Sequence, residues 1–319
     1  MIDLTIEKFC NLSFAIREKP IISPFGGAFV VADPSLLTPE KTPDEQWHIF
    51  FHTTFGIYHF KSENGIDFKR VQKVVANAMR PNINKVGDSY YLFYEKTRNL
   101  LANALTLANL TKWKSTIYVQ KSEDLINWSK PCEIINKAGG YETNLRGSSI
   151  SNPFLLEIDN EYRMYFSSGL TYIKDCGFCE PTYIQYATSK YVDGHYVVAD
   201  EPIIKPNKDI QYLNLCSGCL KVYKLKDGYI GIQNGIYEEQ NESHSAILLL
   251  LSKDGLHFEF NKMLVSPNKD NKNSWMHQFV YASHLVMFDN KLRLYFNARD
   301  TSNMLKGREC IGFAEAIIK

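Results

Sequence analysis

The sequence predicts an all-β protein, a five-bladed β-propeller, and two observations support this. The stretch Ala32-Asp33-Pro34 has four diverged counterparts along the chain, each followed by an aromatic-rich run and, in the first four copies, by a turn built around a serine. Five copies spaced 60 to 67 residues apart are typical of a radially repeated β architecture. The four counterparts are Arg80-Pro81-Asn82, Ser151-Asn152-Pro153, Cys216-Ser217-Gly218-Cys219 and Tyr281-Ala282-Ser283.

Each repeat predicts one four-stranded blade. The first strand begins at the motif, the second is the aromatic run, the third ends at the serine turn, and the fourth leads to the next blade. The turns provide tight conformations that Gly adopts at little cost, so we expect their role to be structural. The predicted blades span residues 30–75, 76–140, 141–205, 206–268 and 269–319, within one domain that includes the whole chain of 319 residues.

Two segments outside the repeat complete the prediction. The alternating run Leu4-Thr5-Ile6 is expected to form a strand that completes the last blade, because the fifth repeat ends at its third strand. Closure of this kind removes a free sheet edge. Residues Leu100 to Leu110 form the one predicted helical insertion.

Composition excludes several classes of function. The formal net charge is +1 and no charged run stands out, which argues against phosphate-backbone binding and therefore against nucleic acid. No stretch approaches the ~20 apolar residues of a membrane span, and the N-terminus lacks a signal-peptide pattern. Seven cysteines, an odd number, fit a reducing compartment. We therefore expect a soluble, cytoplasmic protein, and the sequence leaves its oligomeric state open.

The predicted topology gathers particular side chains on one face. The first residues of every inner strand and the loops between second and third strands meet around the axis, while the serine turns lie on the opposite face. The polar residues predicted on this axial face come from the strand starts and from the loops, and Glu142 and Arg146 lie close by. They are Asp33, Arg80, Asn82, Asn152, Ser217, His277, Glu95, Arg98, Asp175 to Glu180, Glu238, Glu239, His244, Arg299 and Asp300.

On these motifs the chain resembles the five-bladed propeller glycosidases, namely glycoside hydrolase family 43 and its relatives, the invertase and levansucrase group. The resemblance covers nearly the whole chain through the repeat, the Ala32-Asp33-Pro34 opening, the Asn152-Pro153-Phe154 opening and the serine turns. It implies an inverting glycosidase with an Asp general base opening blade one, an Asp that tunes pKa opening blade three, and a Glu general acid opening blade four.

Only one of these three carboxylates is present. Asp33 matches the base, but the tuning position is Asn152 and the acid position falls on Ser217. A serine cannot serve as a general acid near neutral pH, so either another group protonates the leaving oxygen or the reaction is not ordinary hydrolysis. Glu180 is the first candidate for this proton donor. The other candidates are Glu95, Glu142, Glu238, Glu239 and His244.

Further residues are predicted to bind the substrate. Arg80, Arg146 and Arg299 could clamp a carboxylate or phosphate on an anionic sugar, or be ordinary surface arginines. His277 resembles the family histidine near the axis that holds water or a cation, and a packed histidine is the alternative. The predicted aromatic walls of the sugar pocket are Phe55, Tyr58 and Trp275.

Two cysteine pairs have zinc-ligand spacing. Cys176 and Cys179 lie in the blade-three loop, and Cys216 and Cys219 open blade four, so the blade model places both pairs on the same face. Four thiolates, or three with Glu180, could hold Zn²⁺ at the vacated acid position. Alternatively, these are small buried residues, because Cys is among the most buried residue types. The family resemblance itself requires no cofactor.

Three hypotheses about function follow. The first is a carbohydrate-active enzyme, a glycosidase-like hydrolase acting on a small sugar or oligosaccharide with Asp33 as base. The second is a non-catalytic carbohydrate-binding propeller that kept the pocket. The third is a sugar-modifying enzyme of another reaction type, zinc-dependent, in surface-polysaccharide or sugar-nucleotide metabolism.

Overall fold

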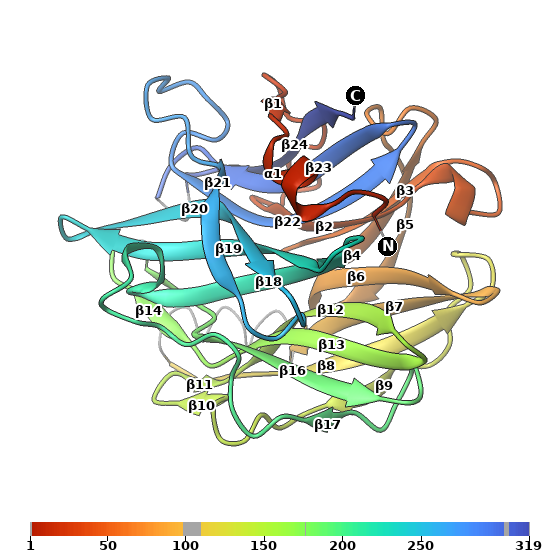
Figure 1. Ribbon diagram of the computed structural model, residues 1–319, viewed down its shortest axis with the longest axis horizontal. Helices are drawn as coiled ribbons and strands as arrows, with labels where there is room; N and C mark the ends of the chain where they lie inside the picture. Colours follow the sequence, from red (N-terminus) through yellow and green to blue (C-terminus); the bar gives the residue numbers. More distant parts are fainter. Residues whose placement is uncertain (1, 98–109, 176, 303–305, 319) are drawn as a thin grey trace.

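The computed structural model describes residues 2–97, 110–175, 177–302 and 306–318. The structure is an all-β five-bladed propeller, as the sequence predicts, and its sheets follow one another around the molecule (Figure 1). The predicted helix at 100–110 lies almost entirely outside the described residues, and so does Arg98, which is predicted on the axial face. Within those ranges, no helix has the length and apolar character needed to cross a lipid bilayer.

Each blade is an antiparallel sheet whose first strand is innermost. Blade one consists of β2 (Val31–Leu37), β3 (Trp47–Thr53), β4 (Gly56–Ser62) and β5 (Lys69–Ala76). Blade two consists of β6 (Ala78–Val86), β7 (Ser89–Thr97), β8 (Trp113–Ser122) and β9 (Cys132–Ile135). Blade three consists of β12 (Ile150–Ile158), β13 (Glu161–Ser168), β16 (Tyr183–Ser189) and β17 (Val197–Val198).

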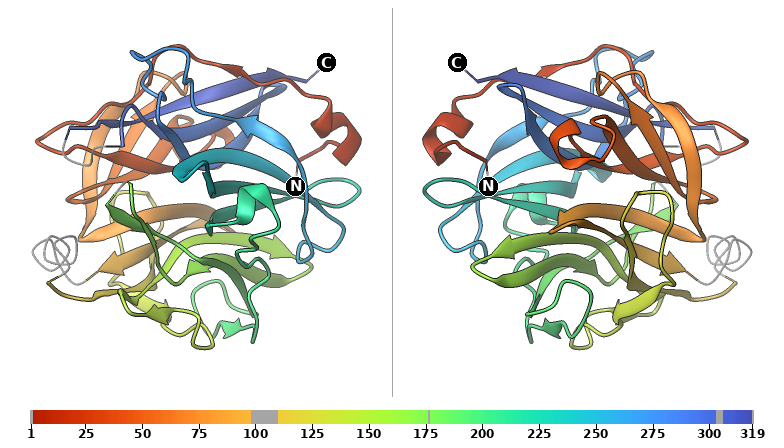
Figure 2. Two further views of the ribbon diagram at one scale, coloured as in Figure 1. Left: turned by 90° about the vertical axis from the view of Figure 1, so that its left-hand side faces the viewer. Right: turned by 90° about the vertical axis from the view of Figure 1, so that its right-hand side faces the viewer.

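Blade four consists of β18 (Cys216–Lys224), β19 (Tyr229–Glu239), β20 (Glu242–Ser252) and β21 (Glu259–Val265). Blade five consists of β22 (Phe279–Phe288), β23 (Lys291–Arg299), β24 (Glu309–Ile317) and the N-terminal β1 (Ala15–Ile16). The first blade, in red to orange, lies beside the blue fifth blade in both views of Figure 2, so the ring closes.

The closing strand differs from the predicted one. Ala15–Ile16 pairs with β24, whereas Leu4 to Ile6 form no strand. Thr5 instead caps the short helix α1 (Ile6–Cys10) by accepting a hydrogen bond from the backbone N–H of Lys8. Leu4 and the helical Phe9 pack into the core between blades four and five, so the apolar residues of this segment are buried by packing and not by strand pairing.

Additions outside the blades position part of the site. A hairpin of β10 (Thr143–Asn144) and β11 (Gly147–Ser148) extends the sheet of blade two, since β11 pairs with β8. A second hairpin, β14 (Thr171–Ile173) with β15 (Phe178–Glu180), lies between the second and third strands of blade three. The short 3₁₀ helices are η1 (Pro39–Lys41) and η2 (Gln211–Leu213).

The core consists of layers between neighbouring blades. Each of the five interfaces holds a hydrophobic cluster, such as the one where Phe50 and Leu92 of blades one and two meet. Because both faces of a blade are buried, β3 is buried at all seven positions, with no alternation of buried and exposed residues. This packing fixes the blades relative to one another and so fixes the inner strands around the axis.

The serine turns have the structural role that their sequence predicts. Ser62 Oγ accepts hydrogen bonds from the backbone N–H groups of Asn64 and Gly65, and Asn64 Oδ1 accepts from the two N–H groups that follow. Tyr295 of the preceding blade donates to the Gly65 carbonyl oxygen at 2.9 Å. Tyr165 of blade three donates in the same way to the Gly255 carbonyl oxygen of blade four at 2.7 Å, so these two turns also tie neighbouring blades together.

Candidate active site

Five equivalent residues of the inner strands surround the propeller axis. Strand register identifies them. In blade one, Phe50 of the second strand pairs with Ser35 of the first strand, and Asp33 lies two residues before Ser35. The same position in each of the other blades gives the equivalent residue. All five line one axial cavity of about 410 Å³. They are Asp33, Arg80, Asn152, Cys219 and Ala282.

The backbone turns three of these side chains toward the axis. Asp33, Arg80 and Asn152 have φ values of 54°, 53° and 51°, and each precedes a proline at a β-bulge. Asp and Asn tolerate this left-handed conformation, whereas for Arg it is uncommon and is often found at functional sites. The neighbouring blade stabilises this backbone conformation at Asp33, because Asn297 Oδ1 accepts a hydrogen bond from the Asp33 N–H at 3.1 Å.

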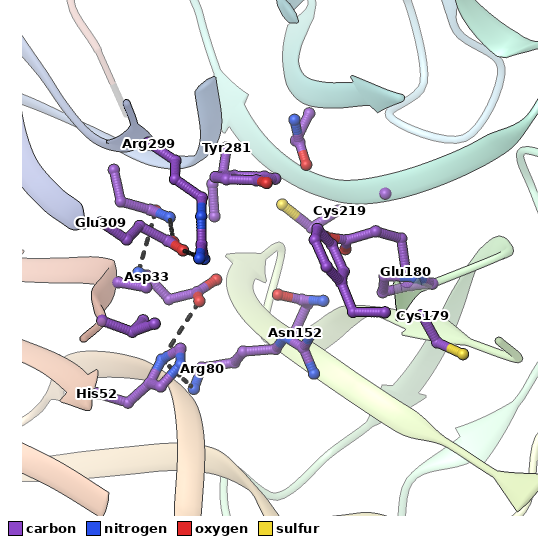
Figure 3. Close-up of a pocket in the computed structure, with 18 of the residues that line it drawn as sticks. Asp33, His52, Arg80, Asn152, Cys179, Glu180, Cys219, Tyr281, Arg299 and Glu309 are labelled. Carbon is purple, nitrogen blue, oxygen red and sulfur yellow. Dashed lines mark hydrogen bonds and ion pairs between the residues drawn. The ribbon is translucent and has the colours of Figure 1, made fainter. Parts of the chain in front are cut away.

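Asp33 projects into the cavity beside a neutral histidine. Its Oδ2 lies 3.3 Å from Nδ1 of His52, which also lies 3.3 Å from the backbone nitrogen of Arg80 (Figure 3). Burial lowers the pKa of His52 to about 4, against the opposing effect of Asp33, so the ring is neutral at pH 7. His52 Nδ1 therefore accepts from the backbone N–H of Arg80, and the neutral ring lies beside Asp33 without adding a charge.

Arg80 forms an ion pair with Glu95, whose side chain is completely buried. Burial alone would lower the pKa of Arg80, but Glu95, followed by Asp33 and Glu180, holds it above its ordinary value. Glu95 lies beneath Arg80 and does not line the axial cavity. Its role is to fix the guanidinium, so it is not available as a proton donor to a ligand.

Arg299 and Glu309 form a second pair on the blade-five side. Arg299 Nη1 lies 3.6 Å from Glu309 Oε2, and Asn297 Nδ2 donates to Glu309 Oε1. Burial raises the pKa of Glu309 to about 7, with Asp33 adding to the rise and Arg299 opposing it. Asn297 thus connects the backbone of Asp33 to the Glu309 carboxyl.

Glu180 faces the cavity from the β14–β15 hairpin. In the view of Figure 3 it lies to the right and Asp33 to the left, with Asn152 between them. Burial raises the pKa of Glu180 to about 8, and nearby carboxylates add to the rise while Arg80 opposes it. The carboxyl is therefore mainly protonated at neutral pH, as a general acid must be.

The other proton-donor candidates do not line the axial cavity. Glu142 accepts hydrogen bonds from the N–H groups of Ala138 and Gly140, which gives it a structural role. Glu238 and Glu239 lie at the exposed end of β19, and His244 stacks on Tyr237 with ring centroids 5.5 Å apart.

Several predicted substrate-binding residues also lie elsewhere. Trp275 stacks on Phe296, and Nδ1 of His277 lies 3.1 Å from the Asn268 carbonyl oxygen, because both residues belong to the loop before β22 and not to the inner strand. Tyr58 is packed in the core between blades five and one, and Phe55 does not line the cavity. Arg146 lines a smaller neighbouring cavity, with its guanidinium 4.2 Å from the Tyr172 ring centroid.

The cysteines do not form a metal centre among the described residues, where no group of three or more His, Cys, Asp or Glu gathers at metal-binding spacing. Cys176 lies outside those residues. Cys216 is fully buried among apolar side chains, while Cys219 and Cys179 line the cavity. Burial raises the pKa of Cys219 to about 11 and raises that of Cys179. The zinc site predicted from the two cysteine pairs includes Cys176 and stays a prediction.

The register corrects the predicted acid position. The bulge of β18 lies between Cys216 and Cys219, nearer the strand start than the bulges of blades one to three. Counting back two residues from Lys221, which pairs with Ile232, makes Cys219 the residue equivalent to Asp33. Ser217 is completely buried, and its hydroxyl has no hydrogen-bond partner among the residues that the structure describes. Neither residue supplies a carboxyl.

Sequence reasoning missed His52, Asn297 and Glu309. The sequence does contain a pattern that points to His52 and Asn297, because every aromatic run ends in a polar residue at the same position. The five residues are His52, Glu95, Ser167, Asn234 and Asn297. Glu309 is found by register, since it pairs with Arg299 across β23 and β24.

Models of protein families give no match to this chain, and neither do curated proteins. Among solved structures, the chain resembles a thermostable family-43 glycoside hydrolase, with a TM-score of 0.60 and 14% identity over 92% of this chain and 91% of that one. The structure of a family-62 hydrolase in complex with xylotriose matches with a TM-score of 0.62 and 10% identity, over 95% of this chain and 96% of that one.

A third solved structure comes from a study of glycoside hydrolases in family 130, a family of mannoside phosphorylases, that target β-1,2 mannosidic linkages in Candida mannan. Its TM-score is 0.66, with 16% identity over 95% of this chain and 93% of that one. At these identities the likeness concerns the fold. It confirms the predicted resemblance to the five-bladed propeller glycoside hydrolases.

Proposed function

We propose that this protein is a carbohydrate-active enzyme that cleaves a glycosidic bond in the axial cavity. The observation that carries the proposal is the pair of carboxyl groups, Asp33 and Glu180, facing one cavity from different blades. Glu180 has a pKa raised to about 8, so it holds the proton that a general acid donates. By the sequence resemblance, Asp33 matches the general base of the propeller glycosidases, which supports the proposal.

In the proposed hydrolysis, Asp33 removes a proton from a water molecule whose oxygen attacks the anomeric carbon. The bond from this carbon to the leaving oxygen breaks, and Glu180 gives its proton to that oxygen, so the leaving group departs as a neutral alcohol. Asn297 holds the backbone of Asp33 in position by accepting from its N–H group. Asn152 offers a neutral amide to the hydroxyl groups of the sugar.

The charges around the cavity favour a neutral sugar over an anionic one. Arg80 is paired with Glu95 and lies near Asp33, and Arg299 lies beside Glu309, so carboxyl groups of the protein already face both guanidinium groups. A clamp for a carboxylate or phosphate would need guanidinium charge that is not balanced in this way.

A carbohydrate-binding protein without catalysis is the second candidate. It is favoured by the neutral side chains of Asn152 and Cys219, which stand where the resemblance implies two carboxylates. The two candidates agree on the cavity and on the sugar, and they differ in whether the bond is broken.

The variant Asp33→Asn separates the two candidates. We expect wild-type protein to hydrolyse a member of a panel of disaccharides and aryl glycosides, and Asp33→Asn to lose about a thousandfold in kcat while still binding that sugar in calorimetry. The matched control is Asp159→Asn, an exposed aspartate at the turn between β12 and β13, which should retain full activity. Sugar binding without turnover by the wild type would establish the binding protein instead.

A further inference from the structure

A second, smaller cavity adjoins the axial cavity. Its volume is about 160 Å³, and Arg80, Phe178 and Cys179 line both spaces. Its remaining walls come mainly from the two added hairpins and from Trp113, the first residue of β8. The side cavity is therefore a feature of the insertions in this chain and is not produced by the repeated blades.

We propose that this side cavity binds the leaving group of the substrate, as a six-membered ring stacked on aromatic side chains. The proposal rests on the proposed function. It makes the substrate a disaccharide, an oligosaccharide end or a glycoside with a ring-shaped aglycone, and not a glycoside whose leaving group is small.

The position of Glu180 determines which part of the substrate enters the side cavity. Glu180 is the last residue of β15, and the two residues before it, Phe178 and Cys179, form the boundary between the two cavities. A general acid donates its proton to the oxygen of the bond being broken. A bond that crosses this boundary places its oxygen beside Glu180 and its leaving group in the side cavity.

The size and lining of the cavity fit one ring. Its volume of about 160 Å³ is less than half that of the axial cavity, about 410 Å³, so it suits a single ring better than a longer chain. Trp113, Tyr172 and Phe178 present aromatic rings, and Met79 and Leu170 add apolar surface. Such faces pack against the C–H groups of a sugar ring or against an aryl ring.

The walls are held in place before any ligand arrives. Asp175, in the turn of the β14–β15 hairpin, accepts a hydrogen bond from the backbone N–H of Ser243 in blade four at 2.9 Å. Asn144 of β10 donates to the carbonyl oxygen of Leu170 beside the hairpin. The two hairpins are thus tied to each other and to the propeller, as a preformed binding site requires.

The variant Tyr172→Ala tests the proposal, because Tyr172 is 42% exposed and its removal should not disturb the core. The kcat/KM of each variant is measured with three substrates carrying the sugar that the wild type accepts: a disaccharide, a 4-nitrophenyl glycoside and a glycosyl fluoride. We expect the disaccharide-to-fluoride ratio to fall about tenfold in Tyr172→Ala, since fluoride is too small to occupy the side cavity. A fall for the nitrophenyl substrate alone would identify an aryl aglycone as the occupant.

The matched control is Tyr191→Ala, a tyrosine 63% exposed just after β16, where all three ratios should stay constant. Unchanged ratios in Tyr172→Ala would overturn the leaving-group site and leave the proposed hydrolysis intact. If no substrate is cleaved, calorimetry with the disaccharide and its monosaccharide decides. Tighter binding of the disaccharide that Tyr172→Ala removes supports the side cavity, and equal affinities overturn it.

Discussion

The two faces of this propeller use the same fivefold repeat in different ways. On the turn face, Ser62, Ser122 and Ser252 accept hydrogen bonds from equivalent backbone N–H groups, because each turn does the same work in its own blade. On the axial face, the five equivalent residues all differ, from the carboxylate of Asp33 to the methyl group of Ala282. The repeats share the same side chain where each blade needs the same turn, and they carry different side chains where five blades surround one asymmetric ligand.

A layer between the two faces combines both behaviours. The last residue of each aromatic run is polar, and in four blades it bonds to the backbone of the next blade, although its chemical type varies. His52 contacts the nitrogen of Arg80, and Ser167 donates to the Gly218 carbonyl oxygen at 2.8 Å. Asn234 Nδ2 donates to the Val280 carbonyl oxygen, and Asn297 Oδ1 accepts from the Asp33 N–H group. The position is preserved by geometry, and the side chain is free to serve the site.

The largest effect that sharpens this comparison is expected on the axial face, from Glu180→Gln. Loss of the proton donor should lower kcat on a disaccharide about a hundredfold or more. The loss should be much smaller on a dinitrophenyl glycoside, whose leaving group needs no proton. In the wild type, activity should fall above about pH 8 as Glu180 deprotonates, and the variant should lack this alkaline limb in its pH profile.

The control for this experiment is Glu239→Gln, an exposed carboxyl at the end of β19. It should leave both the rate and the pH profile unchanged. Equal losses on both substrates in Glu180→Gln would show that Glu180 binds or positions the sugar and does not donate the proton.

On the turn face we expect an effect on stability without an effect on catalysis. Gly65 has φ of +71°, and an added Cβ would lie 2.6 Å from the Arg293 guanidinium and 2.9 Å from the Tyr295 hydroxyl. Gly65→Ala should therefore lower the free energy of unfolding by about 2 kcal/mol, measured by urea denaturation, with kcat unchanged.

Gly87 provides the matched control for this substitution. Its φ is +58°, but no atom lies within 4 Å of an added Cβ. Gly87→Ala therefore tests backbone strain without the steric contact, and it should cost about half as much. A change in kcat for Gly65→Ala would contradict the separation of the two faces.

The sequence predicts the turn face better than the axial face because the turns are local. In the Ser62, Ser122 and Ser252 turns, the serine and an Asn or Asp two residues later determine their own hydrogen bonds, and the repeat spacing then follows by counting. The axial face depends on strand register. Because the bulge of β18 is displaced toward the strand start, Cys219 and not Ser217 lies at the position equivalent to Asp33, and no local sequence pattern indicates this displacement. His277 and Trp275 precede blade five in the chain, but their loop holds them away from the axis.

The smallest predicted effect concerns pH and stability, for which the two faces should respond in opposite directions. The pKa of Glu180 is raised by burial, so the folded state holds this proton more tightly than the unfolded chain, and stability falls as pH rises toward 8. On the turn face, backbone N–H groups, that of His257 first, hold the pKa of Asp254 far below its ordinary value. That carboxylate therefore stabilises the fold above its unfolded pKa, and the contribution is lost as pH falls.

Glu180→Gln should therefore gain stability relative to the wild type between pH 6.5 and 8.5, on the order of 1 kcal/mol after allowance for screening in the open cavity. Urea denaturation at the two pH values measures this difference, with Glu239→Gln as the control that follows the wild type. A constant difference between Glu180→Gln and the wild type across this range would mean that Glu180 is already ionised at neutral pH. It would then be unable to act as the general acid.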